Sequence, residues 1–103
     1  MKDAVKQMSF EWREHSGKDV LWLSGEQGHI ECGELRTELL SAIDTRQEVI
    51  LDMSNISEAG TIFVQLVLSA KKQAASKGIT LRVADPSLAA TTAFERVGLS
   101  AGG

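Results

Sequence analysis

The segment 48–53, Glu-Val-Ile-Leu-Asp-Met, carries three consecutive large apolar residues, Val49, Ile50 and Leu51. Successive side chains of a strand point to opposite faces of the sheet, so an apolar run without alternation indicates a strand that is buried on both faces. Strands of this kind lie in the interior of sheets whose neighbouring strands run parallel. Because parallel strands need a long crossover between them, usually a helix, the run predicts an α/β fold.

The second half of the chain agrees with this prediction. The elements predicted there are a helix over 61–77, a strand over 79–84 and a helix between Asp85 and Gly98. Gly78 is placed to end the first of these helices. Asp85 and Pro86 suit the N-cap and the first position of the last helix, and Leu99 is placed to fold back behind Gly98 as in a Schellman motif.

The first half supplies two more strands and one more helix. The elements predicted there are a strand over 8–15, a turn at 16–19, a strand over 20–23, a glycine-containing loop over 24–33 and a helix over 34–43. Phe10 and Trp12 alternate with charged residues, so the first two strands are expected to form a hairpin. The order β-β-α-β-α-β-α predicts a mixed sheet of about four strands with about three helices.

Composition limits the class of protein further. A chain of 103 residues, with 43% hydrophobic and 24% charged residues, has the size and composition of one globular domain. We expect its core over about 8–100 and a flexible tail at 101–103. A net charge of −3 disfavours nucleic acid as a partner. No apolar stretch suits a signal peptide or a bilayer span, and one cysteine cannot form an internal disulfide, so a cytoplasmic protein without membrane insertion is expected.

Residues that could catalyse a reaction or bind a metal do not form a known motif. His29, Glu31 and Cys32 are close in sequence, but their spacing matches no zinc site or nucleophilic pair, and His15 stands apart. The glycines between 24 and 33 lack the Lys-Ser/Thr ending of a phosphate loop. We therefore predict no catalytic residue, metal or cofactor, and we interpret Cys32 as a small buried hydrophobe.

The helix over 61–77 has more apolar residues than one buried face requires. At about 100° per residue, its core stripe holds Ile62, Phe63, Leu66, Val67, Ala70 and Ala74. Val64 and Leu68 fall outside this stripe and lie beside Thr61, with Gln65 and Lys72 at the rim. Such residues mark either a surface for a partner or a face that another part of the chain covers, and the sequence leaves both open.

Thr61 stands where this helix begins, either as the N-cap or within the first turn. A phosphate there would lie beside free backbone N–H groups at the positive end of the helix dipole. It would also place nearly two negative charges beside Val64 and Leu68, which should break an apolar contact. Thr61 is therefore either a phosphorylation switch for this surface or a simple helix cap.

Two segments resemble a known family. The stretch VILDMSNISEAGTIFVQLVLSAKKQAASKGITLRVADPS at 49–87, the ending AFERVGL at 93–99 and the order of elements together resemble the STAS domain. That family includes the bacterial anti-anti-sigma factors, also called anti-sigma factor antagonists. The resemblance covers roughly residues 8–100 and implies a single STAS-like domain.

The resemblance implies partner switching. In the family, an antagonist binds a kinase-type anti-sigma factor through the start of its second helix, and phosphorylation of a serine or threonine there breaks the complex. The acceptor position falls on Thr61, and Ser57 is a less favoured second hydroxyl. The implied partner-binding residues are Glu58, Gly60, Thr61, Val64, Gln65, Leu68 and Lys72.

Two departures from the family pattern introduce an alternative. Gly60 stands where the family has Asp, and Phe63 stands where Gly is usual. The first expectation is a non-enzymatic regulatory module whose partner is a serine/threonine kinase-type anti-sigma factor or a histidine-kinase signalling protein, with a weak homodimer also allowed. The alternative is a constitutive docking subunit, without phosphorylation, of a chemotaxis signalling assembly or a lipid-transport ATPase complex.

Overall fold

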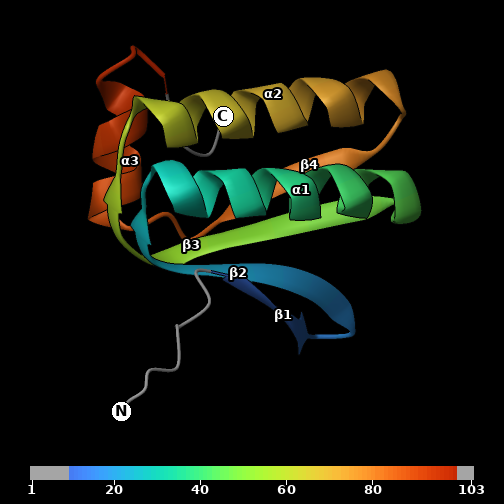
Figure 1. The fold of residues 1–103 in the computed structure, drawn as a ribbon. Helices are drawn as coiled ribbons and strands as arrows, with labels where there is room; N and C mark the ends of the chain where they lie inside the picture. The colour runs from blue at the N-terminus through green and yellow to red at the C-terminus, as the bar shows by residue number, and fades with distance from the viewer. Residues whose placement is uncertain (1–9, 100–103) are drawn as a thin grey trace.

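Residues 10–99 are described by the computed structural model, and their four strands form one sheet (Figure 1). The elements are β1 (Phe10–His15), β2 (Lys18–Gln27), α1 (His29–Thr45), β3 (Glu48–Ala59), α2 (Thr61–Ser76), β4 (Thr80–Ala84) and α3 (Leu88–Glu95). The strand order is β1-β2-β3-β4, with β1 antiparallel to β2 and the other pairs parallel. This mixed sheet confirms the predicted fold class. The predicted strand start at 8–9 and the predicted tail at 101–103 lie outside the described residues.

β3 has the interior position that its apolar run predicts. It pairs with β2 on one side and with β4 on the other. Val49, Ile50 and Leu51 are all buried. Val49 and Leu51 belong to the core beneath the helices, whereas Ile50, which alternates with them, faces the other side of the sheet.

The helices pack on one face and at one end of this sheet. α1 and α2 lie side by side and begin at the same end of the molecule, and α3 stands at that end (Figure 1). Phe63 of α2 and Phe94 of α3 pack edge to face, with ring centroids 6.4 Å apart. This aromatic contact joins α3 to the core that α2 forms with the sheet. None of the helices in residues 10–99 is long and apolar enough to cross a membrane.

The predicted loop at 24–33 is wrong. β2 continues to Gln27 and α1 already begins at His29, with only Gly28 between them. Gly25 has a positive φ of 72° and the ladder shifts register next to it, so this glycine forms a bulge within the strand instead of ending it. The Gly28 N–H donates a hydrogen bond to Glu31 Oε1 at 3.1 Å, which supports an early helix start. β3 is correspondingly longer than predicted, because residues 55–59 pair with the extended end of β2.

The start of the last helix also differs from the prediction, whereas its end agrees. Ser87 is the N-cap, and its Oγ accepts a hydrogen bond from the Ala90 N–H at 3.1 Å. Asp85 has a φ of 47° and belongs to the turn before the helix, so the assignments of Asp85 as N-cap and of Pro86 as the first helical residue are both wrong. At the other end, Leu99 N–H donates to the Phe94 carbonyl at 3.0 Å behind Gly98, whose φ is 78°. This arrangement confirms the predicted Schellman motif.

The predicted hairpin is confirmed, and a tryptophan ties it to the helical layer. Ser16 and Gly17 both have positive φ values, which is the geometry of a tight two-residue hairpin turn. In β1, the Trp12 Nε1–H donates a hydrogen bond to Glu38 Oε2 of α1 at 2.7 Å. The Arg46 guanidinium lies over the Trp12 ring, 3.9 Å from its centroid. Trp12 therefore fastens the edge strand to α1.

Candidate functional site

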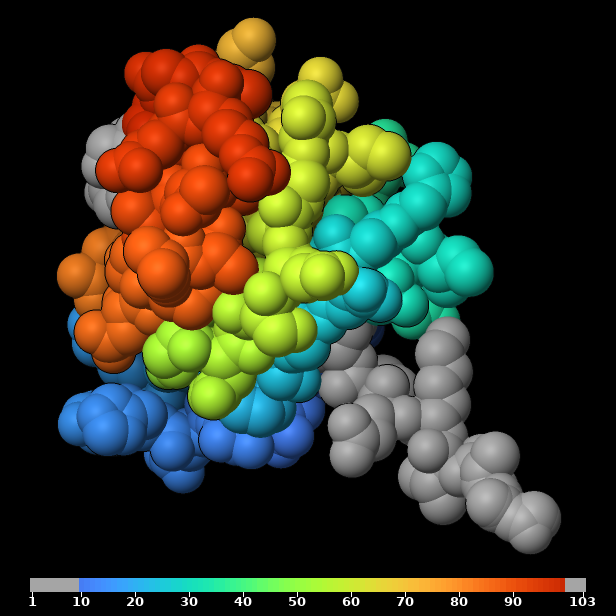
Figure 2. All heavy atoms as spheres, turned by 90° about the vertical axis from the view of Figure 1, so that its left-hand side faces the viewer, coloured from blue at the N-terminus to red at the C-terminus, as the bar shows by residue number. Residues whose placement is uncertain are grey.

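An open groove of about 1010 Å³ lies at the end of the molecule where α1 and α2 begin. Figure 2 shows this end, with the end of β3 and the start of α2 crossing between α3 and the start of α1. The carboxyl ends of parallel strands are the usual binding edge of an α/β sheet, because the connections that follow them leave a crevice there. The lining comes from residues 26–29, residues 56–62 and five residues of the α3 region: Ser87, Leu88, Ala89, Thr92 and Arg96.

Thr61 is the first residue of α2 and is exposed in this groove. Gly60 is the N-cap, so of the two predicted placements Thr61 occupies the first turn. A glycine has no side chain to accept a hydrogen bond, and no side chain caps this helix start. The first-turn N–H groups of α2 therefore point to the groove end without a capping acceptor, which gives the site a local positive polarity.

The predicted partner surface needs one correction. Val64 has only 1% of its surface exposed and belongs to the core, so its assignment to the outer face is wrong. Ile62, which the wheel placed in the core stripe, is 48% exposed. The buried side of α2 is therefore rotated from the predicted stripe toward Val64, because α1, α3 and the sheet together cover the helix.

The remaining predicted residues of α2 do share an exposed face. Leu68 is 39% exposed, and Thr61, Gln65 and Lys72 are also exposed. Together with Ile62 these residues form what we call the α2 outer face. Two apolar side chains, Ile62 and Leu68, flank its hydroxyl, amide and ammonium groups.

Two carboxylates meet at the strand end of the groove. Glu26 of β2 and Glu58 of β3 are direct partners in the parallel register. A hydrogen bond with Glu58, and then the negative charge of Glu58, raises the pKa of Glu26 above its ordinary value. Glu58 was predicted as a site residue, but Glu26 was missed because the sequence indicated a loop at 24–33, which hid the pairing of the two strands.

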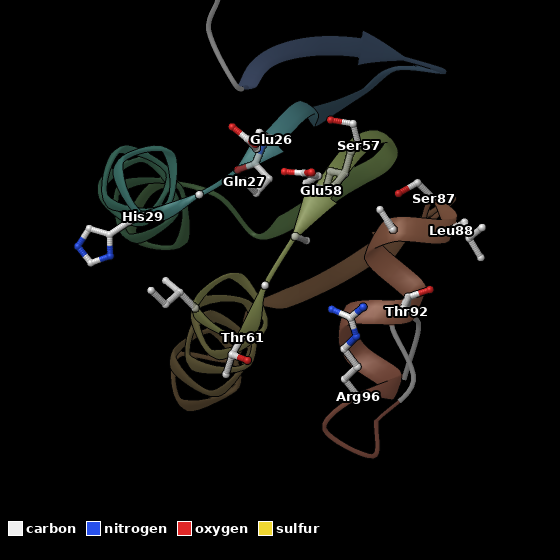
Figure 3. A pocket seen from close by; sticks show the side chains of 16 residues that line it. Glu26, Gln27, His29, Ser57, Glu58, Thr61, Ser87, Leu88, Thr92 and Arg96 are labelled. Atoms are coloured by element: carbon white, nitrogen blue, oxygen red, sulfur yellow. The ribbon is translucent and has the colours of Figure 1, made fainter.

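α3 forms the opposite wall of the groove, which sequence reasoning also missed. Leu88, Thr92 and Arg96 are four residues apart, so they lie on one face of the helix and its last turn. Leu88 is 82% exposed. Figure 3 shows the Arg96 side chain reaching into the groove on the side of Thr61. Within residues 10–99 the Arg96 guanidinium has no hydrogen bond or ion pair. A helix wheel over 86–98 would have placed these three residues on one face.

The other candidates for chemistry lie apart. Ser57 is exposed at the groove, on β3 and not on α2. His29 is at the groove rim, and His15 is at the far end of β1. Cys32 is buried, as predicted, and burial followed by the charge of Glu31 raises the pKa of its thiol. Residues 10–99 contain no group of three His, Cys, Asp or Glu side chains that could hold a metal ion.

Comparison with protein families identifies the domain. The family model described as "Mlab, STAS domain" matches residues 10–101, nearly the whole chain. The chain therefore belongs to the STAS family, which confirms the resemblance. No curated protein matches the chain.

Solved structures share the fold. The unphosphorylated anti-sigma factor antagonist SpoIIAA superposes with a TM-score of 0.73 and 22% identity, covering 87% of this chain and 81% of that one. The phosphorylated form of SpoIIAA, described as a Bacillus cell fate determinant, gives 0.70 and 22%, covering 87% and 84%. An anti-sigma factor antagonist from Mycobacterium paratuberculosis gives 0.69 and 14%, covering 86% and 76%.

Proposed function

We propose that this STAS domain is a non-enzymatic regulatory module that binds a protein partner through the α2 outer face and the adjoining groove. The observation that carries the proposal is the position of Thr61. It is exposed, it is the first residue of a helix without a capping side chain, and apolar Ile62 and Leu68 flank it. Exposed apolar residues beside a groove are typical of a protein contact surface.

Phosphorylation of Thr61 would switch this surface. In that step the γ-phosphoryl group of ATP passes to Thr61 Oγ1, ADP leaves, and the hydroxyl proton is released. The product carries about −1.5 to −2 charges at pH 7. Burying such a charge against Ile62, Leu68 and an apolar partner surface carries a large desolvation penalty. The complex should therefore dissociate.

The chemistry of this surface and membership of the family support two kinds of partner. The first is a serine/threonine kinase-type anti-sigma factor, or a histidine-kinase signalling protein, in the cytoplasm. The second, in the role of a constitutive docking subunit, is a chemotaxis assembly or a lipid-transport ATPase. Gly60 favours the second reading, because the carboxylate that precedes the acceptor in the family pattern is missing here.

The docking surface can be tested with matched leucine variants. Whichever kinase-type, chemotaxis or ATPase protein a neighbouring gene encodes serves as the partner, and binding is measured by calorimetry. Leu68→Asp should weaken binding at least about tenfold, since it places a charge in an apolar contact. Leu40→Asp is the control, because Leu40 is exposed to a similar degree on α1, outside the groove. Equal affinity of both variants would exclude the α2 outer face as the interface.

The switch is tested separately by mass spectrometry after incubation with the partner and ATP. Phosphate is expected on Thr61, and it should be absent in Thr61→Ala but present in Ser57→Ala. If the partner binds and Thr61 stays unmodified, the constitutive docking role is the correct one.

A further inference from the structure

We propose that Arg96 binds the phosphate of phosphorylated Thr61, so that the modified residue is held against α3 within the same chain. This inference rests on the proposed switch at Thr61 and specifies which group of the protein receives the phosphate. It concerns a residue on α3, outside the helix to which the acceptor belongs.

The geometry places the two side chains on opposite walls of one groove. Thr61 stands at the start of α2, and Arg96 stands in the last turn of the α3 segment. In Figure 3 the Thr61 hydroxyl is on the side of α2 that faces α3, and the Arg96 guanidinium extends into the space between the two helices. The Phe63–Phe94 contact fixes the spacing of α2 and α3, because each ring lies two residues from one of these side chains.

The charged residues that line the groove favour a position of the phosphate near α3. Its ionisable lining residues are Glu26, Glu58, His29 and Arg96. Glu26 and Glu58 lie together at the ends of β2 and β3, which leaves Arg96 as the cation on the α3 wall. A phosphate on Thr61 is thus repelled from the strand end and attracted toward α3.

The Arg96 guanidinium is available for this role. Three of the four other arginines in residues 10–99 pair with carboxylates: Arg13 with Glu11, Arg46 with Asp19 and Arg82 with Glu48. Arg96 has no such partner within residues 10–99. A guanidinium can donate two parallel hydrogen bonds to phosphate oxygens, while the uncapped N–H groups of α2 supply donors from the other side.

The consequence is a switch with two effects. The phosphate adds charge to the α2 outer face, and its pairing with Arg96 also bridges the groove from α2 to α3. A partner segment would then meet both electrostatic repulsion and a closed entrance. Loss of Arg96 should therefore weaken the inhibition of binding by phosphate without preventing phosphorylation.

The test uses the full chain with phosphothreonine installed at position 61 by genetic incorporation or by ligation. The second pKa of the phosphate is followed by ³¹P NMR as a function of pH. It is expected to lie about 0.5 to 1 pH unit lower in the parent protein than in Arg96→Ala, because the guanidinium stabilises the dianion. Arg96→Lys should lie between the two, since it keeps the charge but loses the bidentate geometry.

Two controls make this measurement specific. Arg36→Ala removes an exposed arginine of α1 outside the groove and should leave the titration unchanged. All variants are also prepared with His29→Gln, which removes the imidazole that lines the groove. Phosphorylation should in addition shift the Nε–H signal of Arg96 and not that of Arg36.

The inference is overturned if Arg96→Ala and the parent protein titrate alike, or if the Arg96 signal does not respond. Because the phosphate is installed without a kinase, this outcome leaves the docking role and the switch intact. Conversely, an unphosphorylated Thr61 after incubation with the partner and ATP would overturn the switch while the ³¹P result still reports on Arg96.

Discussion

Gly60 stands directly before Thr61 as the N-cap of α2, and the backbone does not require a glycine there. Its φ and ψ are −121° and −168°, an extended conformation that any residue adopts. A Cβ atom at this position would meet nothing within 4 Å. The backbone at residue 60 would therefore accept an aspartate, so the missing carboxylate before Thr61 has no steric cause.

Gly60→Asp should accordingly stabilise the domain. An aspartate at the N-cap accepts a hydrogen bond from the first turn of α2, and replacing glycine lowers the entropy of the unfolded chain. The expected increase in the free energy of unfolding is about 0.5 to 1.5 kcal/mol in urea denaturation. Gly98→Ala is the contrasting control, because its φ of 78° makes any side chain unfavourable by about 1 kcal/mol. A loss of stability in Gly60→Asp would contradict the open geometry at residue 60.

The Glu26–Glu58 pair predicts a dependence of stability on pH. The pKa of Glu26 is raised in the folded domain by the hydrogen bond and then by the charge of Glu58. Its protonated form is thus favoured on folding, and this contribution is fully present below the ordinary glutamate pKa of about 4.3 and lost as the pH rises through the folded value. Glu26→Gln should therefore raise the thermal midpoint at pH 7 and bring no advantage at pH 3.

Thermal unfolding across this pH range checks the prediction. Glu95→Gln, which removes an exposed carboxylate of α3 outside the groove, serves as the control and should change the midpoint little at either pH. If Glu26→Gln lowers the midpoint at pH 7, the two carboxylates do not repel each other in the folded protein.

At the scale of elements, α2 carries two apolar sides, and they have different roles. Val64 is enclosed by the core, whereas Ile62 is about half exposed on the outer face. Val64→Ala should lower the free energy of unfolding by about 2 kcal/mol, because it removes two buried methyl groups and leaves a cavity. Ile62→Ala should lower it by less than about 1 kcal/mol but weaken partner binding. If Ile62→Ala lowered the free energy of unfolding more than Val64→Ala in urea denaturation, the predicted assignment of Ile62 to the core and Val64 to the outer face would be correct.

The periodicity of α2 could be predicted from the sequence, but the direction of its buried side could not. The wheel correctly separated Phe63, Val67, Ala70 and Ala74 as core residues. The error at Ile62 and Val64 arises because the buried side of α2 is set by tertiary packing against α1, α3 and the sheet, which no local pattern reveals. Similarly, three glycines predicted a loop at 24–33, although Gly25 forms a bulge within β2 and the strand continues to Gln27.

At the scale of the whole molecule, the groove exists because three distant parts of the chain meet at one end of the sheet. The order of elements, readable from the sequence, requires the carboxyl ends of β2 and β3 and the starts of α1 and α2 to share that end. The contribution of α3 depends instead on a tertiary contact, the Phe63–Phe94 pair. Thr61 and Glu58 could be predicted as candidate site residues. The spacing of Leu88 and Arg96 places them on one helix face, but the sequence does not show that this face lines the same groove as Thr61, nor that Glu26 pairs with Glu58.

The edge strand β1 is tied to α1 through Trp12, and this predicts a local effect of removing that contact. Trp12→Phe keeps the apolar ring but loses the hydrogen bond to Glu38, which should cost about 1 to 2 kcal/mol. Amide hydrogen exchange should increase in β1 while the groove residues keep their protection. Adding Glu38→Ala to Trp12→Phe should cost little more, because the shared interaction is already lost. Independent, additive effects would show that the two residues are not coupled.

The tight turn at Ser16 and Gly17 precedes β2, and the groove lies where β2 ends, so the length of the sheet separates the two. In Figure 1 the turn joining β1 and β2 lies on the side opposite α3. Exposed turn tips of this kind tolerate inserted sequence better than other positions. A fluorescent label, an immobilisation tag or a second domain placed at this turn should leave the groove open. The same turn thus offers a natural point at which to build a sensor that reports occupancy of the groove.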